Sequence, residues 1–72
     1  MQLMLFDSIH QVLSAEKILK KNDLKIELQP VPRTISSSCG MCIAIEQNEI
    51  MTAEKVLFEN NISIKTSLRV DL

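Results

Sequence analysis

The chain has no tryptophan and no tyrosine, and it contains only two phenylalanines, one glycine and one histidine among its 72 residues. Without aromatic platforms for bases, and with a formal net charge of -1, it lacks the features of a nucleic-acid-binding protein. Its longest apolar run, Met41–Ile45, is far shorter than the roughly 20 residues that a membrane span needs. The N-terminus has no basic start typical of a secretory signal. We therefore expect a cytoplasmic protein that contacts neither nucleic acid nor membrane.

The length limits the protein to one small domain, residues 1–72. A chain of this size buries only about 60% of the surface that its unfolded form exposes, which leaves no room for a deep enzyme cleft. Apolar residues make up 46% and charged residues 24%, as in ordinary globular proteins. The two cysteines, Cys39 and Cys42, are too close in sequence to staple a fold. They are expected to serve either chemistry or packing.

An internal repeat is the most informative feature of the sequence. Residues 14–26 (SAEKILKKNDLKI) and residues 52–64 (TAEKVLFENNISI) align at an offset of 38, and six of the thirteen positions are identical. The same offset aligns the two apolar segments that precede them. The repeat predicts two copies of one unit, about 2–29 and 41–70, joined by residues 30–40.

Each copy is predicted to fold as strand, helix, strand. Ser8 and Gln11 fit a capping box at the start of a helix over 9–21, and an Asn-Asp pair ends it. The second helix is expected over about 49–59, where an Asn-Asn pair ends it.

The strands are expected at 2–6, 25–29, 41–45 and 62–70. Two tandem βαβ units with right-handed crossovers favour one topology. It is an α+β fold, the ferredoxin-like βαββαβ split-βαβ sandwich, with a four-stranded antiparallel sheet and two helices on one face.

Alternation along these strands indicates which side chains face away from the helices. Four apolar residues of the central strands are expected to form a strip on the bare face of the sheet: Met4, Phe6, Cys42 and Ala44. Charged residues of the edge strands are expected around them: Lys25, Glu27, Lys65 and Arg69. In the last strand we expect Ile62, Ile64, Leu68 and Val70 to share one face. Scattered apolar surface residues are ordinary, but such a strip could also form a weak homodimer or dock a partner.

The segment 30–40 breaks the repeat and holds Cys39, both prolines and the only glycine. Two to five residues usually join adjacent antiparallel strands, so its length is an excess, and loops of this kind often carry function. Pro30 and Pro32 hold the chain extended, and Gly40 lets a backbone amide beside the thiol approach a partner closely. The sequence therefore predicts a site centred on Cys39.

Topology is expected to bring further groups to this thiol. The first two strands of the unit run parallel, so the start of the first helix should share an edge of the sheet with the loop. Ser8, His10 and the amides of the first helical turn would then lie near Cys39, with Arg33 inside the loop. A typical thiol is roughly 3% thiolate at pH 7, and a helix dipole is too weak to change that, so Arg33 or protonated His10 must help. The loop hydroxyls are expected to support the site: Ser36, Ser37 and Ser38.

Other constellations in the sequence are weaker. Cys39 and Cys42 have the CxxC spacing of redox and zinc sites, but the motif opens a strand and alternation directs Cys42 across the sheet. Zinc needs four ligands, or three and a water, whereas the chain offers two cysteines and one histidine, so a site would have to be shared across a dimer. Cys42 is thus a secondary candidate or a small buried hydrophobe. No metal site, catalytic triad, carboxylate pair or phosphate-binding loop is predicted within one chain.

The residues named so far resemble a known family. The features are Ser8-x-His10 after a strand, Glu16 in the helix, and PVPRTISSSCG over 30–40. They are similar, over nearly the whole chain, to a small bacterial family of selenium/sulfur carrier protein-like domains. The resemblance implies a carrier that holds sulfur or selenium on a cysteine, by position Cys39. The CPxP motif of other sulfur-relay carriers is absent.

From this resemblance we expect a carrier protein rather than an independent enzyme, without a bound cofactor. A desulfurase-type donor protein would load Cys39 as a persulfide or its selenium analogue, and an acceptor protein would unload it. One alternative is a small protein-interaction or regulatory module in which Cys39 is incidental. Another is thiol redox or metal exchange through Cys39 and Cys42.

Overall fold

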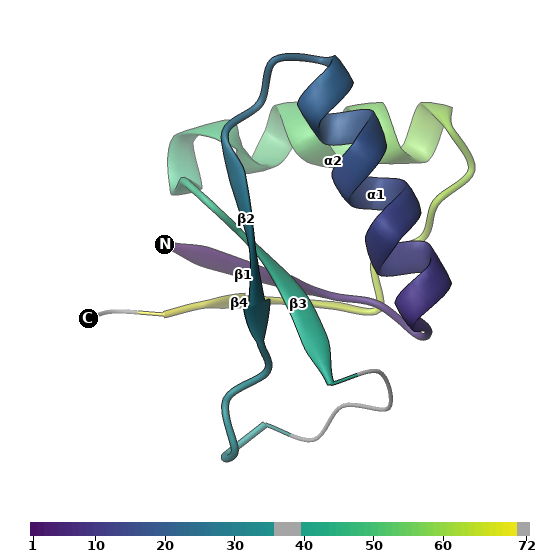
Figure 1. Cartoon of the computed structure of the whole chain (residues 1–72). Helices are drawn as coiled ribbons and strands as arrows, with labels where there is room; N and C mark the ends of the chain where they lie inside the picture. Colours follow the sequence, from purple (N-terminus) through teal and green to yellow (C-terminus); the bar gives the residue numbers. More distant parts are fainter. Residues whose placement is uncertain (36–39, 71–72) are drawn as a thin grey trace.

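The computed structural model describes residues 1–35 and 40–70. The elements are β1 (Gln2–Leu5), α1 (Ile9–Lys21), β2 (Ile26–Pro30), β3 (Met41–Ile45), the 3-10 turn η1 (Gln47–Glu49), α2 (Ile50–Glu59) and β4 (Thr66–Arg69). The strands form one antiparallel sheet in the order β2-β3-β1-β4, and both helices cover the same face of it (Figure 1). This is the ferredoxin-like arrangement that the sequence predicts. None of the helices described is long and apolar enough to cross a membrane.

Helix α1 begins where the sequence predicts, because a polar cap satisfies its first turn. The Ser8 Oγ accepts a hydrogen bond from the Gln11 amide at 3.3 Å. The Gln11 Oε1 accepts from the amide of Asp7, at 3.2 Å, rather than from that of Ser8. The hydrogen bond from the backbone to the Gln11 side chain therefore starts one residue earlier than in a standard capping box.

Both helices end in the same motif. Asp23 and Asn61 adopt left-handed backbone conformations, with φ of 63° and 60°. Asp and Asn tolerate this region better than other side chains, so a chain with one glycine can still end two helices. The side chains of Asn22 and Asn60 each donate to the carbonyl four residues earlier at 2.8 Å. The Schellman bonds run from Leu24 N to Leu19 O, Asp23 N to Lys20 O, Ile62 N to Leu57 O and Asn61 N to Phe58 O.

The main core lies between the helices and the sheet, and two residues placed on the bare face by the sequence analysis belong to it. Met4 and Phe6 are 0% and 1% exposed and pack against α1 and α2. The prediction was wrong for these two because residues 3–6, in β1 and directly after it, are all apolar, so alternation could not tell the two faces apart. The buried residues of this helix-side core are Met4, Phe6, Val12, Ala15, Leu19, Ile43, Ile45, Ala53 and Leu57.

The opposite face of the sheet carries a second cluster, which we call the outer cluster: Leu3, Leu5, Cys42 and Ala44. Cys42 and Ala44 were predicted on this face, and the structure confirms it. All four side chains are at most 3% exposed, because Val31, Ile35, Leu68 and Val70 pack against them. The central strands thus present no bare strip, and the residues predicted for a homodimer contact are buried within one chain.

Strand β4 is shorter than predicted, and its alternation does not extend back to residue 62. Ile62 and Ile64 pack against the helix-side core, whereas Leu68 and Val70 pack against the outer cluster. The chain bends at residue 65 before the strand begins, and this bend breaks the register of alternation. The prediction that Arg69 lies at the rim of the outer face was also wrong. Arg69 pairs with Gln2, and Gln2 pairs with Ile45 of the helix-side core, so these three residues share the helix side of the sheet.

Candidate functional site

Four chain segments meet at one edge of the sheet, which we call the loop edge. Leu5 pairs with Cys42 in β3 and with Thr66 in β4, and Cys42 pairs in turn with Gln29 in β2. The ends of β1 and β2 and the starts of β3 and β4 therefore lie side by side, and α1 begins just beyond β1 (Figure 1). For the described residues, this confirms that the start of α1 and the ends of the 30–40 segment share an edge.

The segment is held firmly where it leaves and re-enters the sheet. The amide of Val31 donates to the carbonyl of Gly40 at 3.0 Å, which extends the β2–β3 ladder past the pair Pro30 and Met41. Inside it, the amide of Ile35 donates to the carbonyl of Pro32 at 2.9 Å and closes a turn. Val31 and Ile35 pack on the outer cluster, and Arg33 and Pro32 between them are exposed. The predicted cation is thus presented to solvent on an anchored turn.

Gly40 is needed for its backbone conformation. Its φ is +75°, a region that side chains rarely adopt, while a Cβ built there would meet no atom within 4 Å. Glycine is therefore required here by the backbone conformation, and not by a lack of space for a side chain. The predicted site residues Ser36, Ser37, Ser38 and Cys39 lie outside the described residues.

The first turn of α1 presents hydrogen-bond donors at the loop edge. Ser8 is half-buried and uses its hydroxyl to cap the helix. Within residues 1–35 and 40–70, nothing accepts a hydrogen bond from the amides of Ile9 and His10, and the first turn holds no acidic residue. His10 is exposed, and its side chain makes no contact with Arg33 through a hydrogen bond or ion pair. His10 and the amides of the first helical turn thus lie at the loop edge, but His10 is not joined to Arg33 there.

An ion pair at the loop edge was not predicted from the sequence. Lys65 Nζ lies 3.7 Å from Asp7 Oδ1, and the Lys65 amide donates to the Leu5 carbonyl at 2.8 Å. Lys65 was predicted on the outer rim of the sheet, but the bend before β4 brings it to the edge instead. The only sequence signal was the position of Asp7, between the end of a strand and a helix cap. Both side chains are at least half exposed, so the pair contributes a modest, salt-sensitive interaction.

Cys42, the secondary candidate, is buried in the outer cluster. Its side chain is 0% exposed, and its Sγ lies 4.0 Å from the carbonyl oxygen of Pro30. A thiol without solvent access behaves as a small apolar side chain with a weak donor, which favours packing over exchange chemistry. In the part of the chain that the structure describes, no three His, Cys, Asp or Glu side chains are grouped to hold a metal ion.

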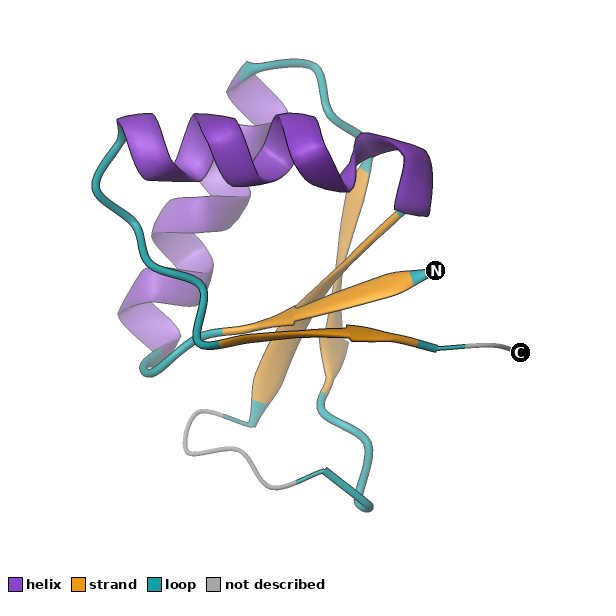
Figure 2. Ribbon diagram, turned by 180° about the vertical axis from the view of Figure 1, so that it is seen from behind, coloured by secondary structure: helices purple, strands orange, loops and turns teal. Residues whose placement is uncertain are grey.

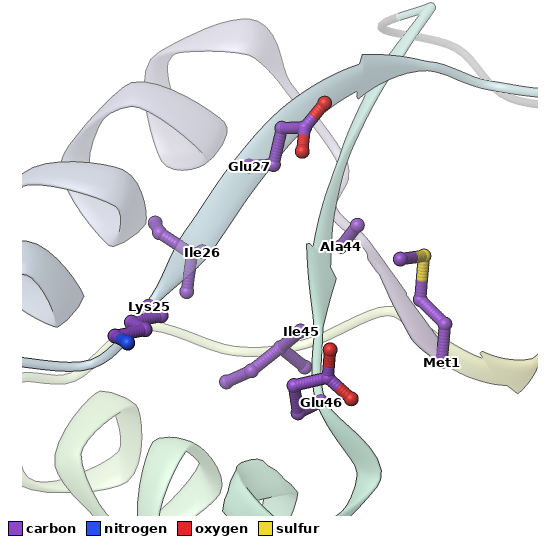
Figure 3. A pocket seen from close by; sticks show the side chains of 7 residues that line it. All are labelled: Met1, Lys25, Ile26, Glu27, Ala44, Ile45 and Glu46. Carbon is purple, nitrogen blue, oxygen red and sulfur yellow. The ribbon is translucent and has the colours of Figure 1, made fainter.

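A hollow of about 190 Å³ lies at the opposite end of the sheet. Its lining is Met1, Lys25, Ile26, Glu27, Ala44, Ile45 and Glu46 (Figure 3). The charged side chains are of mixed sign, and those of Lys25 and Glu27 extend in different directions in the view. Binding sites usually have polar groups that converge on a ligand, so this hollow is a weaker candidate than the loop edge.

One comparison with known proteins gave a match. The model of the family described as "Putative Se/S carrier protein-like" matches residues 2–69, which include both helices, all four strands and the 30–40 segment. Searches of curated proteins and of solved structures returned no match.

Proposed function

Because the chain belongs to this Se/S carrier protein-like family, we propose that it carries sulfur or selenium on the thiol of Cys39. The observation that supports this most is that the two ends of the 30–40 segment, which contains the cysteine, are held together. The amide of Val31 donates a hydrogen bond to the carbonyl of Gly40 at the edge of the sheet where α1 begins. A segment anchored at both ends can present a reactive residue to a partner protein while the rest of the domain stays folded.

The proposed transfer requires no oxidant or reductant. The thiolate of Cys39 attacks the terminal sulfur of a persulfide on a desulfurase-type donor. A new S–S bond forms on Cys39 as the donor's S–S bond breaks, and the electron pair leaves with the donor's thiolate. An acceptor thiolate then removes the terminal sulfur by the same exchange. With selenium, the atom attacked is selenium and the bonds made and broken are S–Se bonds.

The groups at the loop edge support this chemistry electrostatically. A typical thiol is roughly 3% thiolate at pH 7, and raising this to about three-quarters needs about 2.7 kcal/mol in favour of the anion. The N-terminus of α1, with the amides of Ile9 and His10 available, contributes about 0.3–1 kcal/mol. Arg33 is the remaining cation within the segment itself, so we assign it the larger share, with His10 as an auxiliary donor.

Loading with sulfur provides a direct test. Wild-type protein, Cys39→Ser and Cys42→Ser would be incubated with a cysteine desulfurase and cysteine, alkylated, and measured by intact mass spectrometry. We expect wild type and Cys42→Ser to gain the mass of one sulfur atom, and Cys39→Ser to gain none. A selenium donor is tested in parallel. Equal gain by Cys39→Ser, or no gain by wild type with either donor, would refute the proposal.

The same variants separate the carrier from its alternatives. If Cys39 is incidental to an interaction module, it should alkylate at the rate of a cysteine in an unstructured peptide at pH 7. If Cys39 and Cys42 exchange metal or electrons together, substituting either should abolish a metal content or a dithiol–disulfide change measured in wild type. The carrier proposal instead expects fast alkylation of Cys39 and no dependence on Cys42.

A further inference from the structure

Helix α2 exposes two large apolar side chains to solvent. Phe58 is 83% exposed and Met51 is 80% exposed, and their spacing of seven residues sets them on one face of the helix. The other phenylalanine, Phe6, is 1% exposed in the core. Single exposed apolar residues are ordinary, so the exposure of Phe58 needs further evidence before it carries a role.

Phe58 borders a shallow hollow of about 400 Å³. Glu54 and Phe58 come from the last turns of α2, and Ile62, Ser63 and Ile64 come from the connection to β4. This connection descends from the end of α2 to the sheet (Figures 1 and 2). Ile62 and Ile64 are half-buried against the core, so the hollow has apolar walls and one carboxylate at its rim.

The repeat shows what is unusual about this hollow. The equivalent positions of the first copy, 38 residues earlier, carry Lys20 for Phe58 and Glu16 for Glu54. There the lysine Nζ lies 3.2 Å from the carboxylate of Glu16, and the lysine side chain is exposed. In the second copy the carboxylate is kept, but it has no ion-pair partner among residues 1–35 and 40–70.

Two further lysines of the first copy are also replaced. Lys21 and Lys25 correspond to Glu59 and Ser63. The helices end in the same Schellman motif, so the backbone is equivalent and the side chains make the difference. The second copy therefore presents an acidic and aromatic surface where the first presents a basic one. Between residues 46 and 59 the only basic residue is Lys55, against Glu46, Glu49, Glu54 and Glu59.

We propose that this hollow binds an arginine side chain, with a neighbouring apolar residue, from a segment of a partner protein. The guanidinium stacks on the ring of Phe58, where its charge interacts with the negative face of the ring. It pairs with the carboxylate of Glu54, which a planar guanidinium can engage through two hydrogen bonds. The apolar neighbour packs on Ile62 and Ile64. The proposal does not depend on the chemistry of Cys39.

Binding of a defined peptide tests the proposal. The probe is the acetylated and amidated pentapeptide Ala-Leu-Arg-Leu-Ala, and its control has glutamine in place of arginine. Both are titrated into ¹⁵N-labelled protein while amide chemical shifts are followed. We expect saturable shifts at Glu54, Phe58 and Ser63 with the arginine peptide, and weaker ones with the glutamine peptide.

Variants then assign the contacts. Phe58→Ala and Glu54→Gln should each weaken the peptide affinity about two- to fivefold, the range of an exposed cation–π contact or ion pair. Met51→Ala is the matched control, because Met51 is as exposed on the same helix but does not line the hollow, and its affinity should not change. All three side chains are exposed, so the melting temperatures should stay close to wild type.

Three results of the peptide titrations would overturn the proposal. They are no saturable shift at the hollow, equal binding of the arginine and glutamine peptides, and unchanged affinity in both Phe58→Ala and Glu54→Gln. Shifts at Phe58 that depend on protein concentration without peptide would show that a second copy of the chain fills the hollow, and would also overturn it. Sulfur loading of Cys39 is measured separately, so either proposal can fail without the other.

Discussion

Replacing Gly40 gives the sharpest prediction about the loop edge. The structure shows that the stability lost on substitution would come from the backbone conformation and not from a steric clash. Its φ is +75°, and a Cβ would meet nothing within 4 Å. Holding an alanine in the left-handed region costs about 1–2 kcal/mol. The smaller conformational freedom of alanine in the unfolded chain returns about 0.4–1 kcal/mol. We expect Gly40→Ala to lower the free energy of unfolding by about 1 kcal/mol, or about 4–8 °C in melting temperature.

A series at position 40 tests this reasoning. Gly40→Asn should lose less stability than Gly40→Ala, because asparagine tolerates the left-handed region, as Asn61 does at the end of α2. Gly40→Val should lose the most, because a β-branched residue is an outlier there. Urea unfolding followed by circular dichroism measures all three. Equal losses, or a full loss of fold in Gly40→Ala, would refute the claim that only the backbone conformation requires glycine here.

Three further predictions test the core and the edge. Phe6→Ala should cost about 3–5 kcal/mol in urea unfolding, because the ring lies in the helix-side core; a loss below 1 kcal/mol would place it on the surface. Ser8→Ala should cost about 1 kcal/mol, whereas Ser8→Asp should keep the cap and most of the stability. A double-mutant cycle of Asp7→Asn and Lys65→Met should give a coupling of at most about 1 kcal/mol that fades with added salt.

The sequence predicted the topology because its strongest signals are local and repeated. The 38-residue offset, the cap at Ser8 and the two helix stops each fix one element, and two tandem βαβ units leave few ways to pair four strands. The second helix differs slightly, since the turn η1 precedes α2 and no side chain caps it. The parallel directions of the first two strands, which follow from a βαβ unit, then placed the start of α1 at the same edge as the ends of the 30–40 segment without any contact information.

The faces of the sheet could not be predicted in the same way. Alternation assigns a face only where polar and apolar residues alternate, and residues 3–5 of β1, the following Phe6 and residues 41–45 of β3 are all apolar. Both strands are buried on both sides, by the helices on one and by Val31, Ile35, Leu68 and Val70 on the other. The error over Met4 and Phe6 follows from this, and so does the failure to place Lys65, whose position depends on the bend before β4.

Burial of the outer cluster links the stability of the sheet to the geometry of the candidate site. Val31 and Ile35 belong to the 30–40 segment, yet they pack on Leu3, Leu5, Cys42 and Ala44 of the central strands. Each apolar side chain of this size stabilises the packed state by about 1.5–3 kcal/mol when fully buried, and these two are only half-buried, so each contributes less. The cluster therefore holds the first half of the segment, and with it the turn that carries Arg33, against the sheet. If Cys39 carries sulfur as proposed, a substitution in the outer cluster is expected to change its reactivity by releasing the turn that carries Arg33.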